Sequence, residues 1–292
     1  FHVLIGGRRS IKEISMSTFY NSERLKYNQM NYNNDVELDN FCSQCLLVIN
    51  AVGPSFKIND KIALHALRNN CHYIDIGGYG ILRDLLKPYE KSIEAQKLCF
   101  IIGVGWMPGI SGVFSKTIIE THLNSPENTN FNIYYGAVDN WSYSSTYDLA
   151  ASSMGKTRSY VYSHGKEIQV SPFRYTHHKF FPFIGHKKIC MPSFDEQLTQ
   201  LATSLKQIRK ISTFIMLNDY ISMGKFMFIK IFYKHNLNKA TLMLQDDYQR
   251  LVKKENKWGS VICQVSKIEP ERKIDTFYYL YTKNNLLYTA LP

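Results

Sequence analysis

Long apolar runs are missing from this sequence of 292 residues. No stretch of about 18 apolar residues occurs, so no segment qualifies as a membrane-spanning helix. The closest approach, residues 211–233, is interrupted by Asn218, Asp219, Lys225 and Lys230. This segment could lie on a membrane surface as a basic amphipathic helix, but we favour packing against a partner subunit or its own domain.

Cysteine is sparse. Six cysteines are scattered through the chain, and Cys42 and Cys45 form the only CxxC pair. No second CxxC or CxxH stands at the spacing of a zinc finger, so we expect no metal site. A redox pair would open a helix after a strand, whereas this pair closes an expected helix before one. We therefore expect thiols packed in the core of a protein of the reducing cytoplasm.

Acidic residues are also in short supply, because 24 Asp and Glu face 35 Lys and Arg, and the formal net charge is +11. This balance favours anionic partners such as phosphate-bearing cofactors, carboxylate substrates, membrane surfaces or nucleic acid. The densest basic stretch is residues 174–188, where Arg, His and Lys stand among Phe and Pro. No nucleic-acid-binding motif accompanies it, so we interpret it as a solvated or substrate-domain surface rather than a nucleic-acid interface.

The first half of the chain alternates short apolar runs with helical stretches. Strands are expected at residues 2–5, 25–32, 46–49, 73–76 and 99–102, and helices at residues 11–19, 36–45, 58–70 and 82–97. Such alternation predicts crossover connections and a parallel sheet. The apolar runs lack polar alternation, as is typical of strands covered on both faces. We therefore predict a Rossmann-like, doubly wound α/β domain.

The second half mixes strands and helices, which predicts an inserted α+β domain. A helix is expected at 111–122, a polar break at 124–130, strand-like runs at 131–183, helical stretches at 194–235 and 240–254, and a hairpin at 260–266 and 274–281. We place a partial dinucleotide-binding domain at residues 1–112, a substrate and dimerisation domain at 113–281, and a return toward the first domain at 282–292.

Four glycine-containing loops follow the expected strands of the first domain. They are residues 6–10, 50–54, 75–80 and 103–109. In a doubly wound sheet, ligands bind at the carboxyl ends of the strands, and glycine there lets the backbone approach a ligand closely. Four such loops in succession predict a dinucleotide-binding site.

Arg8 and Arg9 follow the first visible strand, where no Asp or Glu is present. In a dinucleotide-binding fold, an acidic residue after the second strand binds the ribose hydroxyls of NAD, whereas arginine suits the 2′-phosphate of NADP. NADP is therefore the expected cofactor, provided that residues 2–5 form the second strand of the fold. A solvated basic turn is the alternative.

The loop Gly6-Gly7-Arg8-Arg9-Ser10 lacks the later glycines of a GxGxxG phosphate loop, which should follow a first strand. We therefore expect the first strand and its phosphate loop to precede Phe1, as one strand–loop–helix unit of about thirty residues. We also expect a further helix beyond residue 292.

Three segments resemble the saccharopine dehydrogenase family. Val48-Ile49-Asn50-Ala51-Val52-Gly53-Pro54 looks like its VNxxGP segment, and His72-Tyr73-Ile74-Asp75-Ile76-Gly77-Gly78 is similar to its HYVD(I/L)(S/T)GE strand. Gly105-Trp106-Met107-Pro108-Gly109-Ile110 resembles its GLDPGI turn. Order and spacing agree, so the resemblance covers roughly residues 1–120.

The resemblance implies an NADP(H)-dependent oxidoreductase that forms homodimers and transfers hydride to the C=N bond of a small anionic or amine-containing substrate. The implied cofactor-binding residues are Gly7, Arg8, Arg9, Asn50, Ala51, Val52, Gly53, Pro54, Asp75, Gly77, Gly78, Trp106 and Met107. The sequence departs from the family at Gly78 or Tyr79, where an acidic residue is expected, at Met107, which replaces Asp, and at Ser111-Gly112.

These departures keep two alternatives open. Met107 and the apolar segment 211–233 are compatible with a reductase of C=C bonds in a lipid-like substrate, and the lost acidic positions with a non-catalytic scaffold. In the second domain, the loop expected around Asp139 offers Trp141, Tyr143, Tyr147 and Asp148 as substrate-binding residues. His177 and His178 stand in another expected loop. Hydride transfer needs orientation and one proton donor, which the sequence leaves unassigned.

Overall fold

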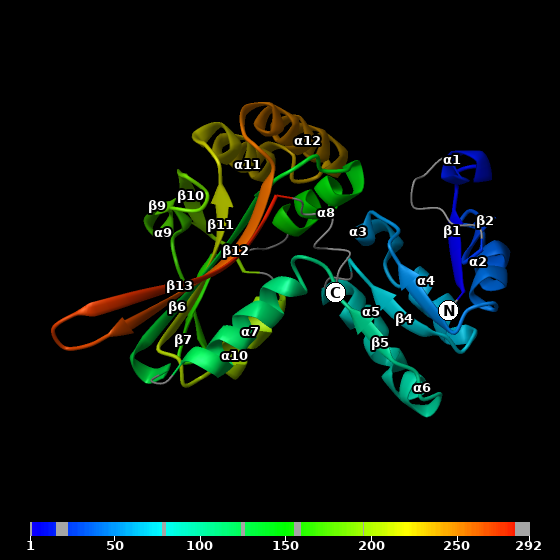
Figure 1. Cartoon of the computed structure of the whole chain (residues 1–292), viewed down its shortest axis with the longest axis horizontal. Coiled ribbons are helices and arrows are strands. Elements are labelled where there is room, and N and C mark those ends of the chain that lie inside the picture. The colour runs from blue at the N-terminus through cyan, green and yellow to red at the C-terminus, as the bar shows by residue number, and fades with distance from the viewer. Residues whose placement is uncertain are drawn as a thin grey trace. The chain divides into compact units, whose positions relative to one another are not determined.

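The computed structural model describes residues 2–15, 23–77, 80–123, 126–154, 159–194 and 196–283. The chain divides into two compact units, Phe1–Gly103 and Val104–Pro292, called here unit 1 and unit 2 (Figure 1). Each unit is built around its own sheets and core.

Unit 1 contains two parallel sheets. Strand β1 (Val3–Gly7) pairs with β2 (Leu25–Gln29), and β3 (Leu47–Asn50), β4 (His72–Asp75) and β5 (Phe100–Ile102) form a second sheet in that order. The helices are α1 (Ile11–Ser15), α2 (Asp35–Cys42), α3 (Ser55–Ile58), α4 (Lys61–Arg68), α5 (Gly80–Leu86) and α6 (Glu90–Ala95), with a 3-10 turn, η1 (Lys87–Tyr89). The predicted alternation of helices with parallel strands is confirmed.

Helices α2 and α4 form one layer over a shared core. The Asn34 side chain begins α2 by accepting bonds from the backbone N–H groups of Val36 and Glu37. Leu38 and Cys42 of α2 lie in the same cluster as Ile62 of α4 and residues of β3 and β4. Burial raises the pKa of the Cys42 thiol to about 12, so it packs as an apolar group.

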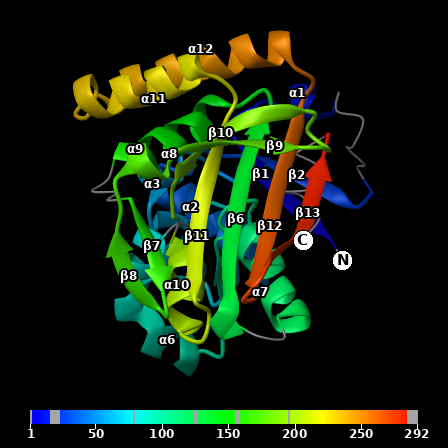
Figure 2. The same cartoon turned by 90° about the vertical axis from the view of Figure 1, so that its left-hand side faces the viewer.

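Unit 2 is built on one mostly antiparallel sheet of eight strands. The order is β13-β12-β6-β11-β10-β9, with β7 on β11 and β8 on β7. The strands are β6 (Thr129–Val138), β7 (Tyr160–Ser163), β8 (Lys166–Gln169), β9 (His177–Phe181), β10 (His186–Pro192), β11 (Lys210–Leu217), β12 (Trp258–Ile268) and β13 (Lys273–Thr282). Its central pair, β6 and β11, is parallel. Figure 2 shows these two strands side by side.

Two groups of helices pack against one face of this sheet, because Ile211 and Leu217 of β11, one in each core cluster, are an even number of residues apart. Helices α7 (Ile110–His122) and α10 (Glu196–Ser204) pack against β6 and β12 in one core cluster. Helices α8 (Tyr143–Met154), α11 (Tyr220–Phe232) and α12 (Leu237–Lys254) share another cluster with β10 and the end of β11. Two short elements, η2 (Pro126–Asn128) and α9 (Pro172–Tyr175), complete the described structure.

Two predicted elements of unit 2 are wrong. Residues 143–154 form α8 instead of a loop and strand, because Ser142 acts as a helix start: its hydroxyl accepts from Ser145 N at 3.2 Å. The predicted helical stretch 194–235 contains a strand, β11, whose apolar run is central in the sheet and buried on both sides. In such a short apolar run, the spacing of the apolar residues does not distinguish a strand from a helix.

The segment 211–233 is therefore a strand end followed by α11. Within the parts of the chain that the structure describes, no helix is long and apolar enough to cross a membrane. The histidines expected in a loop, His177 and His178, lie instead on strand β9.

Arg250 connects α11 to α12 through two carboxylates. Its guanidinium donates to Asp219 Oδ2 at 2.7 Å, and its Nε donates to Asp247 Oδ1 at 2.9 Å. Asp219 also begins α11 by accepting from Ser222 N. Partial burial alone would raise the pKa of Asp219, but bonds from Arg250 and Ser222 lower it to about 2.

Replacing Arg250 by Met should lower the unfolding free energy of unit 2 by about 1.5–3 kcal/mol, because charge-assisted bonds are lost and Asp247 stays buried. All three tryptophans lie in unit 2, so urea unfolding followed by tryptophan fluorescence reports on it. Arg272→Met, which removes an exposed ion pair with Glu269, is the matched control and should leave stability unchanged.

Arg250→Met should also change how the stability of the protein depends on pH. A lowered carboxyl pKa stabilises the fold above pH 4, and this contribution disappears as the pH falls toward about 2. The unmodified protein should therefore lose more stability between pH 4 and pH 2 than Arg250→Met. Equal slopes for the two proteins would contradict this assignment.

Candidate functional site

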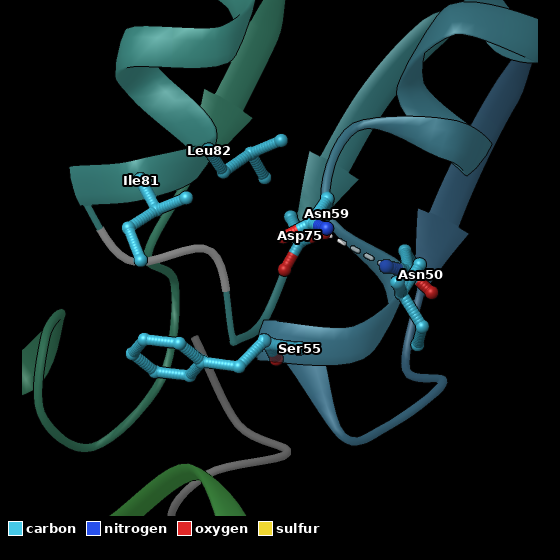
Figure 3. Close-up of a pocket in the computed structure, with 8 residues that line it drawn as sticks. Asn50, Ser55, Asn59, Asp75, Ile81 and Leu82 are labelled. Atoms are coloured by element: carbon cyan, nitrogen blue, oxygen red, sulfur yellow. Dashed lines mark hydrogen bonds between the residues drawn. The ribbon is translucent and has the colours of Figure 1, made fainter. Parts of the chain in front are cut away.

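Asn50 and Asp75 end the neighbouring parallel strands β3 and β4 and lie opposite each other in register. Asn50 Nδ2 donates to Asp75 Oδ2 at 2.7 Å (Figure 3). Asn50 Oδ1 accepts from Val52 N at 3.0 Å, which turns the chain directly after β3. Both side chains are buried, with 5% and 3% exposure. One amide–carboxylate pair therefore sets the start of two loops.

Asp75 receives two further hydrogen bonds. The Tyr73 hydroxyl donates to Oδ2 at 2.5 Å, and the backbone N–H of Gly77 donates to Oδ1 at 2.9 Å. Burial and the nearby Asp75 carboxylate raise the pKa of Tyr73, so this phenol stays protonated. A carboxylate has about four acceptor positions, and the described donors to Asp75 occupy three of them.

A pocket of about 310 Å³, including space open to solvent, lies beside this pair. Its polar wall is formed by Asn50, Ser55, Asn59 and Asp75, and its apolar wall by Phe56, Ile58, Ile81 and Leu82. Figure 3 shows Ile81 and Leu82 on α5 across from the polar residues.

Gly77 allows the loop after β4 to pass close to the loop after β3. A Cβ atom at this position would overlap the Ser55 hydroxyl. A larger residue would therefore displace the Ser55 side chain, which lines the pocket. Contact with this side chain, and not left-handed geometry, explains the glycine here.

Arg8 and Arg9 follow β1 directly and are both exposed. Tyr27 OH donates to the Arg9 carbonyl at 2.7 Å, and Gln29 Nε2 donates to the Arg8 carbonyl at 3.3 Å. Strand β2 thus holds the backbone of the turn. Among the residues that the structure describes, neither guanidinium forms an ion pair with a carboxylate, and both side chains are exposed to solvent.

A larger pocket lies in unit 2, at the carboxyl ends of the parallel strands β6 and β11. It encloses about 660 Å³, including space open to solvent. Its lining comprises Trp106, Met107, Tyr135, Gly136, Ala137, Trp141, Leu149, Ile215, Met216, Leu217, Asn218, Ser222, Phe226, Leu244, Asp247, Tyr248 and Leu251. Trp141 stacks on Tyr248 at a ring distance of 4.7 Å.

The wall of this second pocket is mainly apolar. Its one acid, Asp247, is 4% exposed and already bonded to Arg250 and Lys225. Asn218 accepts a bond from the buried Lys188 ammonium at 2.6 Å. The described lining contains no Lys or Arg, so the pocket lacks the cationic wall that the net charge suggested for a carboxylate substrate.

The structure groups only some of the predicted site residues. Asn50 and Asp75 share the first pocket, and Trp106, Met107 and Trp141 share the second. Tyr143 donates instead to Asn238 at 2.8 Å, and Tyr147 and Asp148 are buried on α8 outside the pocket lining. Gly78 lies outside the described residues. The other predicted cofactor-binding residues do not line the first pocket. Gly7 ends β1, Arg8 and Arg9 follow it, and Ala51 through Pro54 follow β3.

Several residues of the two sites were not identified from the sequence. Tyr73 stands two residues before Asp75, so the period of a strand places both on one face, and this spacing could have indicated their contact. Ser55 and Asn59 lie on or just after the short helix α3, most of which precedes the helix expected at residues 58–70. Asp247 and Tyr248 belong to α12, whose approach to the pocket depends on tertiary packing alone.

No family model and no curated protein matches the chain. Among solved structures it is similar to an engineered D-amino acid dehydrogenase bound to NADP+, with 8% identity over 99% of this chain and 85% of that chain, at a TM-score of 0.40. The DAP dehydrogenase of C. glutamicum in complex with DAP gives 8% identity, 99% and 85% coverage and a TM-score of 0.43.

Biliverdin reductase from Synechocystis sp. PCC 6803, in complex with biliverdin and NADP+, gives 9% identity over 94% of this chain and 84% of that chain, at a TM-score of 0.36. These neighbours are dehydrogenases and reductases. At these sequence identities and TM-scores, the structural similarity assigns neither a family nor a substrate to this chain.

Asp75→Asn should weaken unit 1, because an amide cannot accept from Asn50, Tyr73 and Gly77 at once. We expect the opening free energy of the β3 and β4 amides to fall by about 1.5–3 kcal/mol, as measured by hydrogen exchange. Asp84→Asn on the exposed surface of α5 is the matched control and should have no measurable effect. If the β3 and β4 amides of Asp75→Asn exchange as slowly as those of Asp84→Asn, Asp75 does not hold these loops.

Proposed function

We propose that the chain belongs to an NADP(H)-dependent oxidoreductase of the saccharopine dehydrogenase type, which transfers hydride to a C=N bond of an amine- or amino-acid-derived substrate. The observation that carries this proposal is the Asn50–Asp75–Gly77 arrangement, which shapes two loops at the carboxyl ends of parallel strands beside a pocket. This is the position at which sheets of this type bind dinucleotides.

The residues of unit 1 fit the groups of a dinucleotide. Among the described residues only Gly77 N donates to Asp75 Oδ1, so this oxygen can also accept from a ribose hydroxyl. Arg8 and Arg9 present planar cations suited to a phosphate. We propose that the loops at 7–9, 50–54 and 75–78 hold the cofactor. NADPH, when bound, supplies the hydride, and the chain supplies orientation and exclusion of water.

For the substrate, we propose the pocket at the ends of β6 and β11, which brings Trp106 and Met107 together with Trp141. Its apolar wall would hold the hydrocarbon part of a substrate, and the stacked rings of Trp141 and Tyr248 would orient a flat group. The bonded state of Asp247 argues against a direct ion pair with substrate.

The same apolar wall favours a second candidate, a reductase of C=C bonds in a lipid-like substrate. The two functions differ in the bond that NADPH reduces. Cyclic imines and mixtures of amines with keto acids test the first, and unsaturated ketones with long alkyl chains test the second. If the protein binds NADPH but oxidises it with neither set, a non-catalytic scaffold is favoured instead.

The protein should bind NADPH more tightly than NADH. Arg8→Ala with Arg9→Ala should lower NADPH affinity by about 1.5–3 kcal/mol, because charge-assisted hydrogen bonds to the 2′-phosphate are lost. Lys87→Ala with Lys91→Ala removes the same charge from exposed positions of unit 1 and is the matched control. Fluorescence titration with both cofactors measures the difference. Equal affinity of the unmodified protein for NADPH and NADH would refute the choice of NADP.

Ala137→Phe should fill the pocket of unit 2, since Ala137 lines it at the end of β6. We expect kcat/KM for the substrate to fall by about tenfold or more, which corresponds to about 1.4 kcal/mol, while NADPH affinity is unchanged. Ala137→Ser, which adds little volume, should retain activity. Unchanged turnover by Ala137→Phe would place the substrate elsewhere.

A further inference from the structure

Asn218 is a polar residue of the unit 2 pocket whose side-chain orientation is fixed by a buried charge. It follows β11 directly and lines the pocket at the carboxyl ends of β6 and β11. Its Oδ1 accepts a hydrogen bond from Lys188 Nζ at 2.6 Å. A lysine ammonium carries three N–H donors and no acceptor, so the carboxamide oxygen and not the nitrogen must face it. The Nδ2 group of Asn218 therefore points away from Lys188.

Lys188 is itself held in place on β10. Its side chain is 1% exposed, and its Nζ also donates to Glu255 Oε2 at 3.0 Å and lies 4.9 Å from the centre of the Trp258 ring. Burial lowers the pKa of Lys188, whereas the hydrogen bond and the charge of Glu255 favour the ammonium form. A buried ammonium is costly without its acceptors, so it keeps the Asn218 oxygen in this orientation.

The backbone on both sides of Asn218 is fixed as well. Leu217 pairs with Ile189 of β10. Asp219 begins α11 and accepts from Arg250 Nη1 at 2.7 Å. A side chain whose neighbours and whose own oxygen are already held loses little conformational entropy when its N–H groups bind a ligand. Asn218 is therefore a preorganised donor.

The N–H groups of Asn218 Nδ2 have no acceptor among the residues that the structure describes. The Tyr248 hydroxyl, which lines the same pocket, is likewise without a partner in the described chain. Neither atom is closed off from solvent, because the buried unpaired side-chain atoms of the described residues are Ser111 Oγ and Asn130 Oδ1. Desolvation by the surrounding residues and the charge of Asp247 raise the pKa of Tyr248, so its hydroxyl keeps the proton that it can donate.

Asp247 is the acceptor that an amine would need in this pocket. It is 4% exposed, and its Oδ1 lies 2.9 Å from Arg250 Nε and 3.4 Å from Lys225 Nζ. These two cations compensate the charge of the carboxylate, so an ammonium group would gain little attraction there and would lose its hydration. Asn218 and Tyr248 thus supply the donors that are open to a ligand, and the pocket favours a group that accepts.

We propose that Asn218 binds the substrate through an acceptor oxygen, which belongs to a carbonyl or carboxylate group. Asn218 Nδ2 donates to this oxygen, and the Tyr248 hydroxyl is the second donor. A site built from donors discriminates strongly against a ligand that lacks the acceptor, because its N–H and O–H groups then stay unpaired. The role of the pocket as a substrate site rests on the proposed function, whereas its preference for an acceptor can be tested by itself.

Three probes that share a benzene ring test this preference. Acetophenone presents a neutral acceptor, benzoate a charged acceptor and benzylammonium a charged donor. We expect acetophenone and benzoate to bind the cofactor-free protein about tenfold more tightly than benzylammonium, as measured by isothermal titration calorimetry. Binding without NADPH does not depend on hydride transfer.

Asn218→Asp keeps an oxygen for Lys188 but replaces the Nδ2 donor by an acceptor. This variant should weaken the binding of acetophenone and benzoate about tenfold and strengthen that of benzylammonium. Asn128→Asp makes the same change at an exposed position of η2, which precedes β6 and does not line the pocket, and it is the matched control. Tyr248→Phe, which removes only the hydroxyl, should weaken acetophenone binding about threefold.

Three results would overturn the inference. Equal affinity of Asn218→Asp and Asn128→Asp for acetophenone and benzoate would show that Asn218 is not the donor. Tighter binding of benzylammonium than of the other probes by the unmodified protein would assign the polar contact to Asp247. Failure of all three probes to bind would show that the pocket does not take such a group.

The proposed function fails by a different result. A protein that selects acetophenone and benzoate through Asn218 but oxidises NADPH with no substrate supports this inference and contradicts the oxidoreductase assignment. NADPH oxidation with an unchanged KM in Asn218→Asp contradicts the inference alone.

Discussion

The buried carboxylate of Asp75 is the constraint on which the site of unit 1 depends. A charge at 3% exposure is costly unless donors surround it, and here an amide, a phenol and a backbone N–H do so. Two of these donors belong to other segments of the site, Asn50 at the end of β3 and Gly77 beyond β4. Satisfying one carboxylate therefore fixes the separation of two loops and the shape of the pocket between them.

Unit 2 uses a similar position in a different sheet. Its large pocket also lies where two parallel strands end, although every other pairing in that sheet is antiparallel. The charged groups near this pocket form ion pairs with each other. Arg250 binds both Asp219 and Asp247, which holds α11 against α12. What remains on the wall is mainly apolar and aromatic. This arrangement suits selection of a substrate by shape and burial more than by charge.

The strands of unit 1 could be predicted from the sequence because each is a short apolar run closed by Gly or Asn, a pattern that buried parallel strands share. The strand-end positions of Asn50 and Asp75 followed from the same pattern. Helix α8 could not be predicted in this way, since its aromatic residues resemble a strand and its start depends on the Ser142 hydroxyl. Strand β11 was predicted as helix because the spacing of apolar residues in the run before Asn218 fits both structures. The second pocket depends on packing between distant helices, which no local pattern reports.

A crystal structure of the protein with NADP+ would show directly whether unit 1 binds the dinucleotide. We expect the 2′-phosphate to lie within hydrogen-bond distance of Arg8 or Arg9, and the dinucleotide to contact the loops after β3 and β4. A 2′-phosphate in solvent, or a dinucleotide bound away from the ends of these strands, would contradict it.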